Sequence, residues 1–342
     1  MKVLMISGTY PPQRCGVGDY TEKLVLALRN QNLKVEVLAN IDWSLRHFKN
    51  ICSKIDESSP DIIHIQFPSI GYGYGIVPQL LSLKYKTVIT VHEASQFHPI
   101  RKMFLLPFSI KSDLIFSSQF ECQYFKSIFP WFTRKPFVIP IGANIGSSVN
   151  NFSNEHRNGN EIVYFGLIRP KKGIEQVMAL AVLLKEHHLD YQIKIIGQIL
   201  DKNSEYFSDL KKATEGLPVQ WLINLSENEV EKELSMQTMA YLPFPDGASE
   251  RRGSLLAVLK YGLLVYTTQG PQTPAEFNKI LTYVNSPVEF FKILTALDPE
   301  KITKKLLEKS GDAQSLMKRF EWPEIAKKHI DAYHFFKSHG KK

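Results

Sequence analysis

Short apolar runs alternate with amphipathic stretches along almost the whole chain, and no other feature of the sequence restricts the fold as strongly. The short runs are rich in valine, isoleucine and leucine, and the stretches between them carry apolar residues at helical spacing. Strands that alternate with helices form parallel sheets, because each connection must cross a face of the sheet. We therefore expect an α/β protein with strands at Val3–Ser7, Lys34–Ala39, Asp61–Gln66, Thr87–Val91, Asp113–Ser117, Phe137–Ile139, Ile162–Phe165, Gln192–Ile196, Val219–Ile223, Met239–Leu242 and Leu263–Thr268.

Length and one polar segment divide this alternation into two domains. A chain of 342 residues exceeds the size of most single hydrophobic cores, and 44% hydrophobic residues are ample for two. The segment Gly146–Asn160 is rich in glycine, asparagine and serine and has almost no core-forming residues, which indicates a linker. We predict a first domain over residues 1–148, a linker over 149–160 and a second domain over 161–321.

Local patterns also predict where three helices start. Pro323 suits the first turn of a helix near the end of the chain. The sequence Asp19-Tyr-Thr-Glu22 has the form of a capping box, and Ser254 can cap the helix that follows it.

Composition argues against several classes of protein. No apolar run reaches the roughly 18 residues that a membrane span requires, and Met1 leads into a strand without a cleavable signal region. We therefore expect a cytoplasmic protein. Cys15, Cys52 and Cys122 are an odd number without a Cys-x-x-Cys pair, so neither a disulfide framework nor a zinc site is indicated.

Two loops that follow predicted strands have the character of anion sites. Arg169, Lys171 and Lys172 precede one helix, and Gly253 and Ser254 begin another. The free N–H groups and the positive dipole end of a helix start attract anions. A cation there opposes the dipole by roughly 0.3–1 kcal/mol, so the three cations are better explained if a diphosphate also binds.

These loops and three further motifs, in this order along the chain, resemble glycosyltransferase family 4, retaining enzymes that use a nucleotide-sugar donor. The further motifs are Ser7–Thr21, Thr90–Glu93 and Ile139–Asn144. The loop Asp246-Gly-Ala-Ser-Glu-Arg-Arg-Gly-Ser254 is similar to that of a subgroup with an Asp-Gly-x-Ser-x-Arg-Arg-Gly-Ser pattern. The resemblance implies the GT-B fold, two Rossmann-like doubly wound domains facing each other across a cleft. It also implies that a C-terminal helix, about 322–340, packs back on the first domain.

The same resemblance assigns the site. It places Arg169 and Lys172 on the diphosphate and His92 on the donor sugar, and Asp246 completes the predicted catalytic group. The predicted donor-binding residues are Gly16, Val17, Arg169, Lys172, Ser249, Glu250, Gly253, Ser254 and Leu255, and the predicted acceptor-binding residues are Tyr10, Arg14, Tyr20 and Glu93.

One departure from the family pattern concerns the acids. Two glutamates separated by seven intervening residues are common in the family, but Ser249 and Ala257 occupy these positions here. Asp246 and Glu250 are the acids nearby, and which acid faces the sugar stays open. We expect no metal and no cofactor, because fixed cations can stabilise the leaving diphosphate and the chain has no Asp-x-Asp or His-Glu-x-x-His motif.

The predicted function is metal-independent transfer of a hexose, with retention, from a nucleoside-diphosphate sugar to a glycan or lipid-linked acceptor in surface polysaccharide biosynthesis. The alternative is a catalytically weak nucleotide-sugar-binding scaffold. A nucleotide-dependent dehydrogenase ranks last, because Gly71-Tyr-Gly-Tyr-Gly75 lacks the Gly-x-Gly-x-x-Gly form.

Charge and aromatic residues bear on the partners. The net charge is +8, and residues 98–108 and 125–135 mix cations with bulky apolar side chains. Such faces either contact a membrane surface beside a lipid-linked acceptor or pack normally. Nucleic acid is not an expected partner, because no basic stripe with interleaved aromatic residues crosses a domain.

Overall fold

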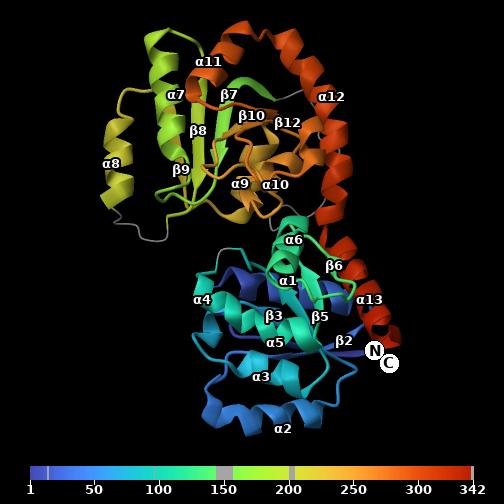
Figure 1. Cartoon of the computed structure of the whole chain (residues 1–342). Helices are drawn as coiled ribbons and strands as arrows, with labels where there is room; N and C mark the ends of the chain where they lie inside the picture. Colours follow the sequence, from blue (N-terminus) through green and yellow to red (C-terminus); the bar gives the residue numbers. More distant parts are fainter. Residues whose placement is uncertain (14, 96, 144–156, 200–204, 340–342) are drawn as a thin grey trace. The chain divides into compact units, whose positions relative to one another are not determined.

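The computed structural model describes residues 1–13, 15–95, 97–143, 157–199 and 205–339 and divides the chain into two compact units. The first unit comprises Met1–Gly142 and Arg319–Lys342, and the second comprises Ala143–Lys318. Each unit contains a parallel sheet of six strands flanked by helices (Figure 1). The predicted class, two doubly wound α/β domains, is confirmed.

The sheet of the first unit has the strand order β2-β1-β3-β4-β5-β6. Its strands are β1 (Lys2–Ser7), β2 (Lys34–Leu38), β3 (Ile62–Phe67), β4 (Thr87–Val91), β5 (Asp113–Phe116) and β6 (Phe137–Val138). Its helices are α1 (Gly16–Asn30), α2 (Phe48–Ser58), α3 (Val77–Lys84), α4 (Pro99–Lys102), α5 (Leu106–Lys111), α6 (Gln119–Ile128) and α13 (Trp322–His339).

Helix α13, from the end of the chain, belongs to the core of the first unit. Successive residues of a strand point to opposite faces of its sheet, and two hydrophobic clusters accordingly cover the two faces. Val3 and Met5 of β1 lie in one cluster with Ile325, Tyr333 and Phe336 of α13. The helix thus covers part of one face of the first sheet.

The sheet of the second unit has the order β12-β11-β10-β7-β8-β9. Its strands are β7 (Asn158–Phe165), β8 (Gln192–Gly197), β9 (Val219–Ile223), β10 (Gln237–Leu242), β11 (Leu264–Thr267) and β12 (Leu281–Tyr283). Its helices are α7 (Ile174–Glu186), α8 (Glu205–Ala213), α9 (Glu227–Ser235), α10 (Gly253–Lys260), α11 (Pro287–Ala296) and α12 (Pro299–Met317). Residues 158–160 of the proposed linker lie in β7, whereas 149–156 lie outside the described residues.

Two predicted helix caps are wrong, and one predicted start is confirmed. Helix α1 already begins at Gly16, so the Asp19 to Glu22 segment lies inside it; the N–H of Asp19 donates to the carbonyl of Cys15 at 2.9 Å. Helix α10 begins at Gly253 after Arg252, so Ser254 is its second residue. Both patterns occur where the backbone has already turned helical, and a cap must lie outside the helix. Pro323 does lie in the first turn of α13.

The structure also bears on cysteine chemistry and membrane crossing. Cys15, Cys52 and Cys122 are buried and unbridged. Within the described ranges, no helix combines the length and apolar character needed to cross a membrane.

Candidate functional site

The turn that follows β7 brings the two predicted diphosphate cations to the start of α7. Lys172 is half-buried, and the hydroxyl of Tyr164 donates to its carbonyl at 3.2 Å, which fixes the backbone of the turn. Arg169, earlier in the turn, is exposed. The arrangement therefore places one half-buried cation and one solvent-facing cation at the carboxyl end of a parallel strand, where ligands bind in such folds.

Gly173, which the sequence interpretation did not single out, is required by this turn. Its φ of 80° is in the left-handed region, and a Cβ built there would lie 2.0 Å from the carbonyl oxygen of Pro243. Any side chain would push the turn away from the loop that follows β10. Two loops that are far apart in the sequence are thus held backbone to backbone.

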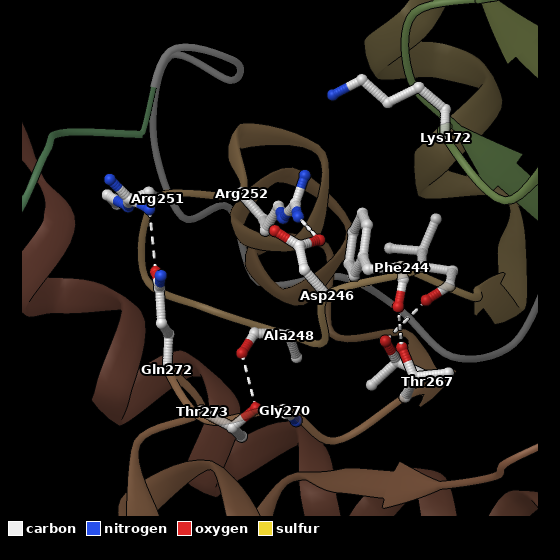
Figure 2. Close-up of polar contacts among 12 residues, drawn as sticks. Lys172, Phe244, Asp246, Ala248, Arg251, Arg252, Thr267, Gly270, Gln272 and Thr273 are labelled. Carbon is white, nitrogen blue, oxygen red and sulfur yellow. Dashed lines mark hydrogen bonds and ion pairs between the residues drawn. The ribbon is translucent and has the colours of Figure 1, made fainter. Parts of the chain in front are cut away.

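Neighbouring threonines hold the loop after β10 in place. The hydroxyl of Thr267 donates to the carbonyl of Leu242 at 2.6 Å, and that of Thr273 donates to the carbonyl of Ala248 at 2.7 Å (Figure 2). Ser249 and Glu250, two predicted donor-binding residues, are buried in this loop. The loop is therefore a fixed part of the fold rather than a loose surface connection.

Arg252 lies in the same loop and is held from two sides. Its guanidinium pairs with the carboxylate of Asp246 and lies over the ring of Phe244, 4.8 Å from the centroid. Arg251 instead donates to Gln272 at 2.8 Å. Asp246, the acid predicted as a catalytic group, thus orients Arg252, to which the sequence interpretation had assigned no role.

Arg169, Lys172 and Arg252 form what we call the cation cluster. Burial lowers the pKa of the Lys172 ammonium, and the positive charges of Arg169 and Arg252 lower it further. Burial and the charge of Arg169 also lower the pKa of Arg252. In Figure 2, the charged ends of Lys172 and Arg252 are directed to the same region. Three like charges within electrostatic range of one another disfavour each other's charged form, and an anion among them removes this penalty.

The helices beside these loops start without a side-chain cap. Gly173 at the start of α7 and Arg252 at the start of α10 make no capping hydrogen bond from a side chain. Gly253, Ser254 and Leu255 form the first turn of α10, with Gly253 exposed. Unlike the capped helix α9, where Ser226 and Glu229 satisfy each other's backbone, these starts leave their N–H groups to other acceptors.

In the first unit, His92 follows β4 and is buried. Its Nε2 lies 2.9 Å from Oε1 of Gln66, and the ring of Tyr20 meets its ring edge-on, with centroids 4.9 Å apart. Burial, with a smaller contribution from His329, lowers the pKa of His92 to about 3. The ring is therefore neutral near pH 7 and can exchange hydrogen bonds without carrying charge.

The other predicted residues of the first unit differ in exposure. Gly16 and Glu93 are exposed, and Val17 and Tyr10 are partly exposed. Tyr20 is buried, with its hydroxyl 3.5 Å from Nε2 of His329. Arg14 lies outside the described residues.

Gly71, the first glycine of the Gly71 to Gly75 segment, has a packing role. A Cβ on Gly71 would lie 1.9 Å from the carbonyl oxygen of Gly8, and the N–H of Gly71 donates to Oγ1 of Thr9 at 2.8 Å. Gly71 therefore lies directly against the loop that follows β1. Its presence is explained without a dinucleotide.

Metal-ligating side chains do not gather in the described part of the chain. No group of three or more His, Cys, Asp or Glu residues there could hold a metal ion.

A scan of protein-family models finds no match, and neither does a search of curated proteins. Solved structures do match. A glycosyltransferase from Rickettsia africae ESF-5 gives a TM-score of 0.72 at 13% identity and covers 99% of both chains. The catalytic domain of starch synthase IV from Arabidopsis thaliana, bound to ADP and acarbose, gives 0.63 at 11% identity, with 99% of both chains covered.

WaaG, a glycosyltransferase involved in lipopolysaccharide biosynthesis, gives a TM-score of 0.60 at 12% identity, with 96% of this chain and 98% of WaaG covered. The chain also spans 60% of the length of the chain that it matches in the GtfA/B complex. At sequence identities this low, the similarity is evidence for the fold alone. The two units have the GT-B architecture of glycosyltransferases, as the resemblance to family 4 implied.

Proposed function

We propose that this protein is a retaining glycosyltransferase that moves a hexose from a nucleoside-diphosphate sugar to a glycan or lipid-linked acceptor. The cation cluster is the observation that carries this proposal. Three cations surround two uncapped helix starts at the carboxyl ends of β7 and β10. A diphosphate has the charge and the acceptor oxygens that such a site needs, and a neutral ligand does not.

The proposed reaction breaks the bond between the anomeric carbon and the diphosphate. Negative charge develops on the leaving oxygen, and Arg169, Lys172 and Arg252 stabilise it from fixed positions. Each charge-assisted hydrogen bond contributes about 1.5–3 kcal/mol. In this scheme the protein cations supply the charge that a divalent metal supplies elsewhere, so we propose that none is required.

Within this scheme Asp246 and His92 have different tasks. Asp246 keeps Arg252 oriented through their ion pair, and the ring of Phe244 supports the same guanidinium. His92, neutral because it is buried, contacts the donor sugar by hydrogen bonding. A role in surface polysaccharide biosynthesis is proposed from the resemblance to family 4 and from the likeness to WaaG.

A binding screen tests the proposal. The purified full chain is titrated calorimetrically with UDP-, GDP- and ADP-sugars in the presence of EDTA. We expect one nucleotide class to bind saturably, and Lys172→Ala and Arg169→Ala to raise the donor KM and lower kcat. Taken together, the loss of these two charge-assisted contacts corresponds to a decrease in kcat/KM of roughly a hundredfold or more.

The matched control removes a cation from the same turn. Lys171 is exposed with a φ of 63°, a conformation that asparagine tolerates, so Lys171→Asn removes the charge without disturbing the backbone. Donor kinetics unchanged in Arg169→Ala and Lys172→Ala would exclude the diphosphate assignment. Binding without sugar transfer would favour the scaffold alternative.

Exposed apolar side chains on the surface of the first unit support the proposed membrane contact. Met103 and Ile110 are exposed by 71% and 53%, and Trp131, exposed by 56%, donates from its indole N–H to Oγ of Ser109 at 3.1 Å, beside Ile110. Arg134 donates to the carbonyl of Ile110. By contrast, the neighbouring aromatic side chains of both segments are packed inside: Phe108, Phe125, Phe129 and Phe132.

Vesicle binding tests this contact. We expect the full chain to cosediment with vesicles that contain anionic lipid and to bind neutral vesicles more weakly. The double variant Met103→Ser and Trp131→Ser should reduce binding at least tenfold, since each buried apolar side chain contributes about 1.5–3 kcal/mol. Leu307→Ser changes an equally exposed side chain of the second unit and is the control. Equal binding by the double variant would exclude this contact.

A further inference from the structure

A row of buried polar side chains crosses one face of the first sheet. His64 and Gln66 are two residues apart on β3, Thr90 lies on β4, and His92 follows β4. All four are between 0% and 4% exposed. We call them the polar strip. Most other buried residues of this face are apolar, so each member of the polar strip requires a hydrogen-bond partner.

Hydrogen bonds join the polar strip to helix α13. The hydroxyl of Tyr333 lies 2.6 Å from Nδ1 of His64. Nε2 of His64 lies 2.7 Å from the hydroxyl of Thr90 and 3.3 Å from Nε2 of Gln66. Oε1 of Gln66 lies 2.9 Å from Nε2 of His92. An unbroken chain of contacts therefore leads from α13 to the residue at the carboxyl end of β4.

The proton positions along this chain follow from the donors and acceptors. Oε1 of Gln66 can only accept, so Nε2 of His92 carries the proton and Nδ1 is left as an acceptor. Nε2 of His64 faces the hydroxyl of Thr90 and the amide N–H of Gln66, so it accepts. Nδ1 of His64 then donates to the hydroxyl oxygen of Tyr333. In this assignment Nε2 of His64 is the shared acceptor of the Thr90 hydroxyl and the Gln66 amide.

We propose that helix α13 sets the ring orientation and the tautomer of His92 through Tyr333, His64 and Gln66. These three are positioning residues, which act on His92 and do not themselves touch substrate. The inference rests on the proposed function, in which His92 contacts the donor sugar, and it extends the site to the end of the chain.

Two observations favour this role over simple core packing. An apolar residue at position 66 would fill the same face without any requirement for partners, whereas Gln66 requires His64, His92 and the sulfur of Met5 to be placed around it. Burial also keeps His64 and His92 neutral, so the tautomer, rather than the charge, is the variable that their partners can set.

Nitrogen NMR of the full chain labelled with ¹⁵N-histidine tests the proposal without any sugar donor. In the parent protein, His92 should show the single tautomer with a proton on Nε2. Gln66→Leu removes the acceptor, and the two ring nitrogens of His92 should shift toward the values of a mixture. Gln66→Glu restores an acceptor that cannot donate when ionised, and it should restore the single tautomer.

Tyr333→Phe tests the other end of the chain of contacts. It also keeps the proposal testable if a Gln66 variant fails to fold. We expect the resonances of both His64 and His92 to shift. The control is Tyr72→Phe, which also removes a buried hydroxyl, here bonded to the carbonyl of Ile6 at 3.3 Å on the other face of the sheet. That variant should leave His92 unchanged.

Kinetics supply the functional test. If His92 contacts the sugar, Gln66→Leu should lower kcat by about tenfold and leave the donor KM unchanged, because the diphosphate is held elsewhere. An unchanged His92 spectrum in Gln66→Leu and Tyr333→Phe would overturn the proposal. A shifted spectrum in a protein that transfers no sugar would support the positioning and exclude the proposed function, so the two can fail separately.

Discussion

Individual residues of the candidate site differ in whether the sequence alone could identify them. Lys172 and Arg169 were identified from the sequence because cations before a helix start are unusual. Gly173 and Arg252 were not assigned, because what gives them meaning is contact with residues far along the chain: Pro243 for the first, and Phe244 with the Lys172 turn for the second. Short-range patterns contain no information on such contacts.

Gly173→Ala should impair the site. A methyl group would meet the carbonyl oxygen of Pro243 at 2.0 Å, in a backbone conformation that already disfavours side chains. We expect a loss of stability of about 1–3 kcal/mol and weaker donor binding, measured by urea unfolding and calorimetry. Gly159→Ala is the control, since no atom lies within 4 Å of its Cβ position and its φ is not positive. Parent-like donor affinity in Gly173→Ala would contradict this account of the turn.

Among elements, the strands were predicted well because parallel strands are buried on both faces, and several of them appear as short, mainly apolar runs. Strand β12, Leu281–Tyr283, was not predicted; it is only three residues long. The contacts of α13 with His64, like that of Gln66 with His92, join residues on separate elements and could not be predicted from local periodicity. The helix itself could be predicted; its polar partners could not.

The first unit, whose core includes helix α13, should be less stable at low pH. Burial lowers the pKa of His92 to about 3 and that of His329 to about 4, and it also lowers that of His64. In the unfolded chain these groups titrate near pH 6.5. Between these values the unfolded chain binds protons that the folded chain does not, so stability is full above about pH 6.5 and decreases as the pH falls. Each histidine contributes up to about 1.4 kcal/mol per pH unit.

Urea unfolding at about pH 7 and about pH 5 measures this dependence. His329→Gln should reduce the change of the unfolding free energy with pH, because it removes one titrating group. His334→Gln is the control, because His334 lies on the same helix but is exposed. A slope identical in the parent and in His329→Gln would contradict the prediction.

For the whole molecule, the division of the chain into units does not follow the order of the sequence. The first unit takes its last helix from residues that follow the second unit. Removing residues 319–342 should therefore destabilise the first unit although its sheet is untouched. Ile325, Tyr333 and Phe336 are between 0% and 3% exposed, and each buried side chain contributes about 1.5–3 kcal/mol.

That loss, about 5–9 kcal/mol in total, is comparable to the whole stability of a typical domain. We expect the shortened chain to lose the cooperative unfolding transition of the first unit and to become sensitive to limited proteolysis within residues 1–142. Resistance equal to that of the full chain would show that α13 contributes little to this core.

The position of α13 also has a consequence for synthesis on the ribosome. Residues 1–142 emerge before the second unit but cannot complete their core until its 176 residues have been translated. Until then, the face that α13 will cover, with the polar strip on it, is open to water and to chaperones. The second unit is contiguous in the sequence and can close while translation continues. We therefore expect the second unit to finish folding before the first, although it is synthesised later. If translation stalls before α13, the nascent chain exposes the uncovered face of its first sheet, and we expect it to be degraded.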